Sequence, residues 1–224
     1  MYNHPMPTRT FEIRLCTSCG LRYPLVEGHT FGMRCPICLS DTRPLLSREL
    51  IFEPKPNRPV DLTLPFGHPS PRSGEYAVLL DNIRSAWNVG SILRSADGFA
   101  FTHAYLCGIT PTPDNEAVAK TSLGAEDSVT WSYHKDAVKL VNGLVREGWL
   151  AWALEEDERA QPIQAVSNLN VRQPVVLILG SEVTGVDPGL LELCDEILYI
   201  PMRGEKKSFN VAMAFSIAAY QLQK

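Results

Sequence analysis

The sequence lacks any long hydrophobic run. Of its 224 residues 45% are hydrophobic, but no apolar stretch approaches the roughly 18 residues that a membrane-spanning helix needs. The first residues, MYNHPMPTRTFEIRL, hold no continuous apolar core of the secretory kind. With 21% charged residues, the composition is typical of a soluble globular protein. We therefore expect a cytoplasmic protein with no membrane partner.

An excess of positive charge is also missing, because 21 lysines and arginines are outnumbered by 25 acidic residues. The balance is uneven along the chain. Residues 1–72 carry nine basic and six acidic side chains, whereas residues 73–224 carry 12 basic and 19 acidic ones. A basic front end on an acidic body suits a front end that contacts phosphates, although an excess of this size also arises by chance.

Cysteine is scarce, yet four of the six cysteines form two pairs of equal spacing. Cys16 and Cys19 lie in CTSCG, and Cys35 and Cys38 lie in CPIC fifteen residues further on. Two such knuckles can place four thiolates tetrahedrally around one zinc ion. Disulfides are the alternative, but they are uncommon in the cytosol. Because four thiolates leave no open coordination position, the spacing predicts a structural zinc.

We expect a small zinc ribbon over residues 10–45, since so short a segment needs a metal to compensate for its small core. The stretches LRYPLVEG and TFGMRC, between the knuckles, are predicted to be two short strands. The ribbon's dispersed arginines either contact phosphates or are simply solvated, and the sequence does not decide; they are Arg14, Arg22, Arg34 and Arg43.

Seven prolines between residues 44 and 72 indicate a semi-extended linker, which we place at 46–73. Its first part, LLSRELIFE, is compatible with a short strand or helix. Residues 74–224 then form the third segment of the chain.

The third segment alternates short apolar runs with helical patterns, which predicts an α/β fold with a largely parallel sheet. Strands are expected at 76–82, 103–109, 127–133, 149–155, 174–180 and 196–201. Helices are expected at 89–100, 136–148, 187–195 and 210–224, with Asp187 as the cap of the third and Pro188 at its first position. The acidic run EEDER at 155–159 is expected to be a solvated loop. The two remaining cysteines, Cys107 and Cys194, are expected to be buried and inert.

A G-x-G-x-x-G motif is absent after the first of these strands, which argues against a standard dinucleotide-binding fold. The glycine-bearing loops come late, in LGSEVTG and PMRGEKKSFN. Because open α/β sheets bind ligands where their strands end, we expect a ligand site in the C-terminal half.

One arginine stands in an otherwise small and apolar helical stretch, DNIRSAWNVGSILRSADGFA. Gly90 lies four residues before Arg94 and Gly98 four residues after it. On a helix these positions neighbour the arginine, and each glycine costs roughly 1 kcal/mol relative to alanine. We interpret the glycines as leaving open space around the guanidinium.

Three stretches of this third segment resemble, in order, the three motifs of the SpoU (TrmH-like) RNA ribose 2′-O-methyltransferases of the SPOUT superfamily. They are NIRSAWNVGSILRSAD, LILGSEVTGV and LYIPMRGEKKSFNVAMAFSIAAY, and KTSLGAEDSVTW is also similar to a common family stretch. The resemblance covers residues 76–224 and leaves out the zinc ribbon.

The resemblance implies a SPOUT-type α/β fold in which the C-terminal segment makes a deep trefoil knot. It further implies S-adenosylmethionine bound in the knot, an RNA substrate (tRNA or rRNA) and a homodimer. The apolar C-terminal helix at 210–222 fits a dimer seam, with an ordinary core helix as the alternative.

The resemblance also assigns a catalytic centre to Arg94, Asn88, Glu182, Ser208 and Asn210. The matching family arginine activates the ribose 2′-hydroxyl. Since a guanidinium normally stays protonated, Arg94 can instead hold a phosphate or stabilise negative charge on the hydroxyl oxygen, and a surface ion pair is its non-functional alternative. On this interpretation the flanking glycines let an RNA backbone approach Arg94.

The other assigned residues have structural alternatives. Asn88 stands where it would cap the helix of Arg94, and Asn210 is a plausible cap of the last helix. Glu182 either orients the cofactor or Arg94, or caps its own loop. Ser208 and Asn210 match a motif that usually reads S-L-N, and Phe209 departs from its leucine, which puts the pocket shape in doubt.

The cofactor positions are likewise carried over from the family. Backbone amides near Gly180, Ile200, Met202 and Phe209 match those that hold the adenosine part. Ser208 belongs to the same cofactor motif, and Leu154 resembles a further cofactor-lining position. Core packing is the alternative for the apolar residues among them.

The sequence therefore predicts an S-adenosylmethionine-dependent RNA ribose 2′-O-methyltransferase with a structural zinc. A non-catalytic RNA-binding or assembly protein on a decayed methyltransferase fold is one alternative, and the retention of Arg94, Glu182, Ser208 and Asn210 argues against it. Methylation of an RNA base on the same fold is the other alternative.

Overall fold

The computed structural model describes residues 9–28, 33–50, 74–168, 172–206 and 208–223. They belong to two compact units, Met1–Lys55 and Pro56–Lys224, which we describe separately. Most of the predicted linker, residues 51–73, lies outside the described residues. None of the helices in the described ranges is long and apolar enough to cross a membrane.

The small unit is a three-stranded antiparallel sheet with the order β2-β1-β3. The strands are β1 (Arg9–Cys16), β2 (Arg22–Val26) and β3 (Thr42–Leu50). The central strand β1 ends at the first knuckle cysteine, and β3 begins just after the second knuckle. The two cysteine knuckles are therefore connected directly to the strands of the sheet.

The strands of the small unit differ in part from the expected ones. The expected strand at 21–28 is confirmed as β2, but the described part of the other, residues 33–35, makes only a single bridge between Arg34 and Asp41. The third strand continues to Leu50 and so includes the first part of LLSRELIFE, for which a short strand was one of the two expected forms. Pro44 is tolerated because β3 is an edge strand whose register shifts opposite Ile13 and Arg14.

The large unit contains a seven-stranded sheet with the order β6-β5-β4-β9-β7-β10-β8. Every strand pairing in it is parallel, which confirms the predicted sheet type. Its strands are β4 (Tyr76–Asp81), β5 (His103–Cys107), β6 (Thr130–His134), β7 (Leu150–Leu154), β8 (Gln161–Pro162), β9 (Val175–Leu179) and β10 (Glu196–Tyr199). Only the two-residue β8 was not expected from the sequence.

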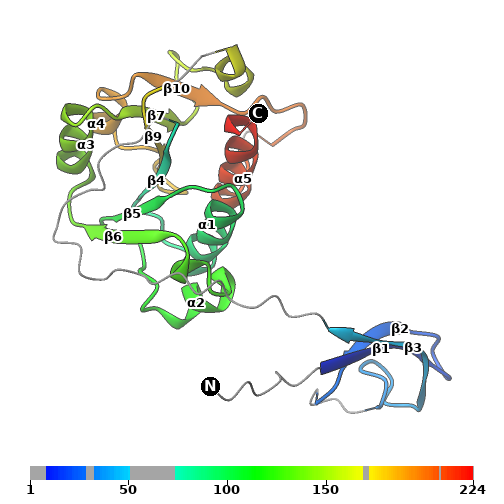
Figure 1. The fold of residues 1–224 in the computed structure, drawn as a ribbon. Coiled ribbons are helices and arrows are strands. Elements are labelled where there is room, and N and C mark those ends of the chain that lie inside the picture. The colour runs from blue at the N-terminus through cyan, green and yellow to red at the C-terminus, as the bar shows by residue number, and fades with distance from the viewer. Residues whose placement is uncertain (1–8, 29–32, 51–73, 169–171, 207, 224) are drawn as a thin grey trace, which may run out of the picture. The chain divides into compact units, whose positions relative to one another are not determined.

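Helices cover both faces of this sheet (Figure 1). They are α1 (Ala86–Gly98), α2 (Glu116–Ser122), α3 (Ala137–Arg146), α4 (Pro188–Leu191) and α5 (Val211–Leu222), with short 3-10 helices η1 (Ala125–Asp127) and η2 (Ile163–Asn168). The helices α1, α2 and α5 lie on one face, and α3 and α4 lie on the other. Neither α2 nor the two 3-10 helices were expected from the sequence.

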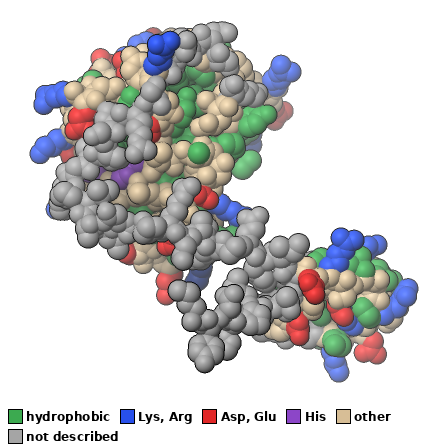
Figure 2. Space-filling view, in the orientation of Figure 1, with side chains coloured by type: hydrophobic (Ala, Val, Ile, Leu, Met, Phe, Trp, Pro, Cys, Tyr) green, Lys and Arg blue, Asp and Glu red, His purple; other side chains and the backbone are tan. Residues whose placement is uncertain are grey.

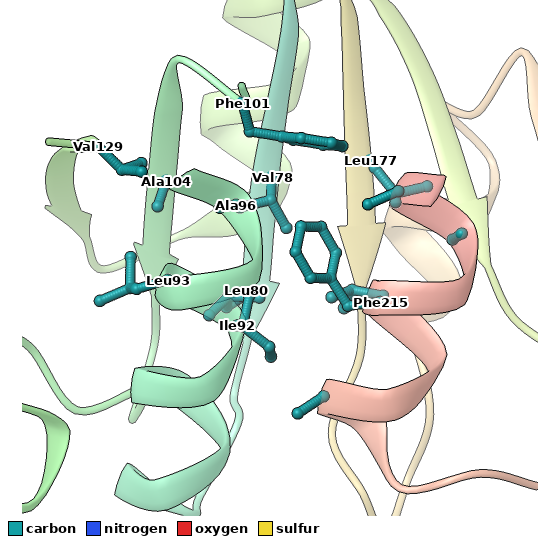
Figure 3. Packing of buried hydrophobic residues seen from close by; sticks show 14 of the residues in the cluster. Val78, Leu80, Ile92, Leu93, Ala96, Phe101, Ala104, Val129, Leu177 and Phe215 are labelled. Atoms are coloured by element: carbon teal, nitrogen blue, oxygen red, sulfur yellow. The ribbon is translucent and has the colours of Figure 1, made fainter. Parts of the chain in front are cut away.

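The sheet has a hydrophobic core on each face, and alternate residues of a strand pack into one core or the other. Val78 and Leu80 of β4 pack toward α1 and α5, while Ala77 and Leu79 pack toward α3. Phe215 of α5 meets Phe101 edge to face with ring centroids 5.1 Å apart (Figure 3). Because both faces are covered, central strands such as β9 are apolar throughout rather than alternating.

The first helix begins earlier than predicted. Ser85 is the N-cap of α1, and its hydroxyl accepts a hydrogen bond from the Asn88 backbone N–H at 3.3 Å. Asn88 is therefore a residue of the first helical turn, and the expectation that it caps the helix is wrong. The caps Asp187 of α4 and Asn210 of α5 are confirmed. The trefoil knot stays a prediction.

Gly90 serves the packing of two helices and does not leave open space around Arg94. A Cβ atom at Gly90 would lie 1.9 Å from Thr121 Oγ1 and 2.5 Å from the Val118 carbonyl oxygen, both on α2. Gly90 is buried in this contact, whereas Gly98, at the helix end, has nothing within 4 Å of its would-be Cβ. The interpretation that both glycines open space for a ligand is wrong at Gly90.

Candidate active site

A cavity of about 420 Å³ lies at the carboxyl ends of β7, β9 and β10. Loops that follow adjacent parallel strands meet at one edge of the sheet, which is where open α/β sheets bind ligands. The structure brings all six predicted cofactor-binding residues into its lining. They are Leu154, Gly180, Ile200, Met202, Ser208 and Phe209.

The wall of this cavity depends on a glycine at position 180. A Cβ atom there would lie 2.2 Å from the Val186 backbone nitrogen and 2.3 Å from the Gly185 carbonyl carbon. The loop after β9 turns back through a bridge between Ser181 and Gly185, and Gly185 adopts a φ of +73°. Only glycine allows the backbone segments to approach each other this closely, so this loop conformation requires glycine at position 180.

Glu155 lines the cavity, although it was not expected to do so from the sequence. It begins the EEDER run, but it is half-buried and lines the cavity. Its Oε2 atom accepts a hydrogen bond of 2.8 Å from the Val186 backbone N–H. The expectation of a solvated loop is therefore wrong for this residue. Its place directly after a buried parallel strand was the signal that could have identified it.

Three of the predicted catalytic residues form one hydrogen-bonded chain. Asn88 Nδ2 donates to Glu182 Oε1 at 3.0 Å, and Asn210 Nδ2 donates to Asn88 Oδ1 at 3.1 Å. Asn210 Oδ1 accepts from the Ala212 backbone N–H at 3.0 Å and so caps α5. Ser208 lines the cavity and is exposed. The three motif regions thus meet at one point.

The Glu182 carboxylate is held in its ionised form. Partial burial raises its pKa, but hydrogen bonds from its own backbone N–H, from Asn88, and from the Arg84 and Ser85 backbone outweigh this effect. The pKa of Glu182 therefore lies below its ordinary value. The site keeps a negative charge at the mouth of the cavity at neutral pH.

Arg94 faces a second cavity, of about 480 Å³, that shares Asn210 with the first one. Asn88, Lys120 and Thr121 also line it. The Arg94 side chain is exposed, and within the described part of the chain it makes no hydrogen bond or ion pair. A permanently charged group that no described residue neutralises, beside a hollow, is suited to binding an anionic ligand.

The four knuckle cysteines of the small unit form a second candidate site. Their sulfur atoms all lie within 4.8 Å of one another, with Cys16 and Cys38 at 3.4 Å and Cys19 and Cys35 at 3.6 Å. A tetrahedral zinc with Zn–S bonds of about 2.3 Å requires sulfur atoms about 3.8 Å apart. The spacing of the donors therefore fits a site in which four thiolates bind one metal ion.

The pKa values of two of these thiols, Cys16 and Cys38, are lowered. Backbone N–H groups of Cys19 and Ser18 point at the Cys16 sulfur at 3.4 Å and lower its pKa. Hydrogen bonds from Ser40 lower the pKa of Cys38 to about 6. At Cys19 a backbone hydrogen bond from Leu21 lowers the pKa, but the neighbouring cysteine thiols outweigh it and raise the pKa to about 12. Because metal ligation requires thiolates, the spacing of the four sulfur atoms, and not their pKa values, is the observation that points to a metal. Cys107 is buried as predicted, whereas Cys194 is only half-buried. Burial raises the pKa of both thiols to about 12, which agrees with the expectation that they are inert.

Solved structures define the class of protein to which this fold belongs. The chain is 25% identical to the TrmH/SpoU tRNA modifying enzyme of A. aeolicus, with a TM-score of 0.59 over 68% of this chain and 75% of that one. An AdoMet-bound rRNA methyltransferase from Sinorhizobium meliloti has the same fold, with a TM-score of 0.63 and 24% identity over 68% of this chain and 57% of that one. The large unit therefore has the SpoU methyltransferase fold.

The family itself is shown by the sequence match. Residues 75–220 match the SpoU rRNA Methylase family, and the chain belongs to this family. Among curated relatives, it is 28% identical to the tRNA (guanosine(18)-2′-O)-methyltransferase of Thermus thermophilus over 153 residues, which are 68% of this chain and 76% of the relative. For other curated relatives the shared stretch covers only 28% or 57% of the relative's length. The small unit with the four knuckle cysteines lies outside the matched residues.

Proposed function

We propose that this protein transfers a methyl group from S-adenosylmethionine to the ribose 2′-hydroxyl of a structured RNA, a tRNA or an rRNA. The observation that carries the proposal is the hydrogen-bonded chain Glu182–Asn88–Asn210, which lies between the cavity at the strand ends and the exposed guanidinium of Arg94. Membership of the SpoU family and relatives named as RNA 2′-O-methyltransferases support it.

The cavity at the ends of β7, β9 and β10 fits S-adenosylmethionine in size and lining. Its volume of about 420 Å³ lies in the range of small-molecule sites, and its wall combines apolar side chains with backbone groups of the Gly180 loop. When bound, the cofactor supplies an activated methyl group on its sulfonium. Leu154, Ile200, Met202 and Phe209 would enclose the adenosine, while Gly180 and Ser208 offer polar backbone or hydroxyl groups.

Arg94 acts on the RNA side of the site. Its guanidinium stays protonated, so it holds a phosphate through paired hydrogen bonds or stabilises negative charge that develops on the 2′-oxygen. Asn88, which precedes it by less than two helical turns on α1, fixes this helix to Glu182 and Asn210. In this arrangement Asn88 and Asn210 position the helices, and Glu182 provides a negative charge at the mouth of the first cavity.

We further propose that Cys16, Cys19, Cys35 and Cys38 bind one structural zinc, because their sulfur spacing suits a closed tetrahedral site. We also propose a homodimer formed through α5. On this largely apolar helix Met213 and Tyr220 are each 57% accessible, and exposed large hydrophobic side chains of this kind are typical of a protein contact. Figure 2 shows hydrophobic side chains exposed on this face of the large unit. We place the enzyme in the cytoplasm with its RNA.

The test is transfer of labelled methyl groups from S-adenosylmethionine to separated tRNA and rRNA, followed by nucleoside analysis. We expect 2′-O-methylated nucleosides with the wild type, and a loss of at least about 100-fold in rate with Arg94→Ala, a size typical of removing a charge-stabilising donor. Arg146→Ala, an exposed arginine on α3, is the matched control.

The alternatives give different outcomes in the same experiment. A decayed methyltransferase fold would bind no S-adenosylmethionine in calorimetry and transfer no methyl group. A base methyltransferase would yield base-modified nucleosides. An Arg94→Ala enzyme that works at the wild-type rate would contradict the role of Arg94.

A further inference from the structure

The two faces of the small three-stranded sheet carry different charge. Successive side chains of a strand point to opposite faces, so Phe11, Ile13 and Leu15 of β1 share one face. The register places Arg22 of β2 and Arg43 of β3 on either side of Leu15, and it places Arg48 opposite Phe11. We call this surface, made of Phe11, Ile13, Leu15, Leu46, Arg22, Arg43 and Arg48, the basic face.

The acidic residues of the three strands lie on the other face. Glu12 alternates with the residues of the basic face along β1, and Glu49 pairs with Thr10. Arg14 also lies there, but it is buried, forms an ion pair with Glu12 and donates to the Thr42 carbonyl oxygen at 2.9 Å. Arg14 is thus a structural residue, in contrast with the exposed arginines of the basic face. The charges of the sheet are therefore segregated.

The basic face is open to solvent. Arg22, Arg43 and Arg48 are exposed, and Leu46 keeps 37% of its surface accessible. Figure 2 shows basic side chains projecting from the small unit. With strands about 4.8 Å apart, Arg22 and Arg43 stand about 10 Å apart across the sheet. Arg48 of β3 pairs with Phe11, four residues along β1 from the Leu15 partner of Arg43, which is about 13 Å in the strand direction. Three guanidinium groups thus surround an apolar centre.

We propose that the basic face binds the phosphodiester backbone of the RNA that the large unit methylates. The inference rests on the proposed function, because it takes the enzyme's RNA substrate as the occupant. Charge complementarity selects this occupant: among strand residues 10–16, 22–26 and 42–49, the face presents three positive and no negative side chains to a polyanion. All three are arginines, whose planar guanidinium matches the oxygens of a phosphate in pairs. The half-buried Phe11 and the leucines offer apolar contact to sugars or bases.

The experiment measures binding of unfractionated tRNA to the full-length protein at several salt concentrations. The variant Arg22→Gln/Arg43→Gln/Arg48→Gln removes the positive charge of the basic face. Lys135→Gln/Lys139→Gln/Arg146→Gln removes the same charge from exposed positions at and before α3, and it serves as the matched control. A third variant replaces the same ribbon arginines with lysine and keeps the charge.

We expect the ribbon glutamine variant to bind tRNA at least about tenfold more weakly than wild type. The slope of log affinity against log salt should fall by about 2 to 3, since each lost phosphate contact removes about 0.7 to 0.9. The α3 control should keep the wild-type slope. The lysine variant should keep most of the slope and lose part of the affinity, because a point charge replaces a bidentate donor.

Zinc content and S-adenosylmethionine binding are measured on each variant to show that both units are folded. If the zinc-loaded glutamine variant binds tRNA with the wild-type affinity and salt slope, the proposal is overturned. It is also overturned if the variant changes the sedimentation behaviour but leaves tRNA binding intact, because the face would then be a protein contact. Methyl transfer by the wild type tests the proposed function separately.

Discussion

Asn88 Nδ2 lies 3.0 Å from Glu182 Oε1, and this hydrogen bond joins residues that are 94 positions apart in the sequence. The same Asn88 side chain accepts a hydrogen bond from Asn210 at the start of α5. One amide therefore fixes α1, the loop after β9 and the last helix to each other. This arrangement explains how loops from different motifs can shape one cavity.

The coupling between Asn88 and Glu182 can be measured with a double-mutant cycle. We expect Asn88→Ala and Glu182→Ala each to slow methyl transfer, and the double variant to be less impaired than the product of the two effects. The interaction free energy should be about 1 kcal/mol, since the two side chains contact each other directly. Rates of methyl transfer at saturating cofactor give the values. Strictly additive effects would show that the two residues act independently.

The lowered pKa of Glu182 predicts a stability difference that depends on pH. Because the folded-state pKa lies below the ordinary value of 4.5, the ionised carboxylate stabilises the native state above about pH 4.5. This contribution is lost as the pH falls through the folded-state pKa. The two oxygens of Glu182 accept one hydrogen bond each, Oε1 from Asn88 and Oε2 from the Arg84 backbone N–H. In Glu182→Gln one of these oxygens is replaced by an NH₂ group, so one hydrogen bond is lost together with the charge.

Urea unfolding of wild type and Glu182→Gln at pH 7, 5, 4 and 3 tests this prediction. The wild type should be the more stable protein at pH 7 and pH 5, and the difference should shrink at pH 4 and pH 3. Thermal unfolding of the two proteins provides an independent measurement. A difference that stays constant over this range, or that grows in acid, would contradict a lowered folded-state pKa for Glu182.

Gly180→Ala should disrupt the cavity at the ends of β7, β9 and β10 in which we propose that the cofactor binds. The new Cβ atom would approach the backbone at Gly185 and Val186, which cannot move away as a flexible side chain would. We expect at least a tenfold loss of S-adenosylmethionine affinity in calorimetry. Gly143→Ala is the matched control, since nothing lies within 4 Å of its would-be Cβ on α3. That variant should bind the cofactor normally and gain about 0.5 to 1 kcal/mol of stability.

The strand and helix order of the large unit was predictable because burial on both faces leaves continuous apolar runs. The β9 segment VVLIL is an example. The caps Asp187 and Asn210 could also be recognised, since their side chains act on neighbouring residues. The predicted cofactor residues came from resemblance to the family, and all six line one cavity, while their binding of a cofactor stays a prediction.

The contacts that the sequence could not indicate are those between distant segments. Nothing in the local pattern shows that Glu155 accepts from the Val186 backbone, or that Pro44 lies in an edge strand beside a register shift. The start of α1 was misplaced because Ser85 and Asn88 are both good capping residues, and only the backbone decides between them. Gly90 was misread for a similar reason, since its partner Thr121 lies on a helix that the sequence analysis did not predict.

The packing role of Gly90 gives a last prediction. Gly90→Ala places a methyl group against Thr121 and the Val118 carbonyl oxygen, so α1 and α2 must separate. Overpacking of this kind costs about 1 to 3 kcal/mol, which outweighs the gain of about 1 kcal/mol in helix propensity. Gly98→Ala meets no neighbouring atom and should leave stability unchanged or slightly higher. Urea unfolding of both variants measures the contrast. If Gly90→Ala were as stable as Gly98→Ala, close packing of α1 on α2 would not be the reason for glycine at position 90, and space near Arg94 would again be the better explanation.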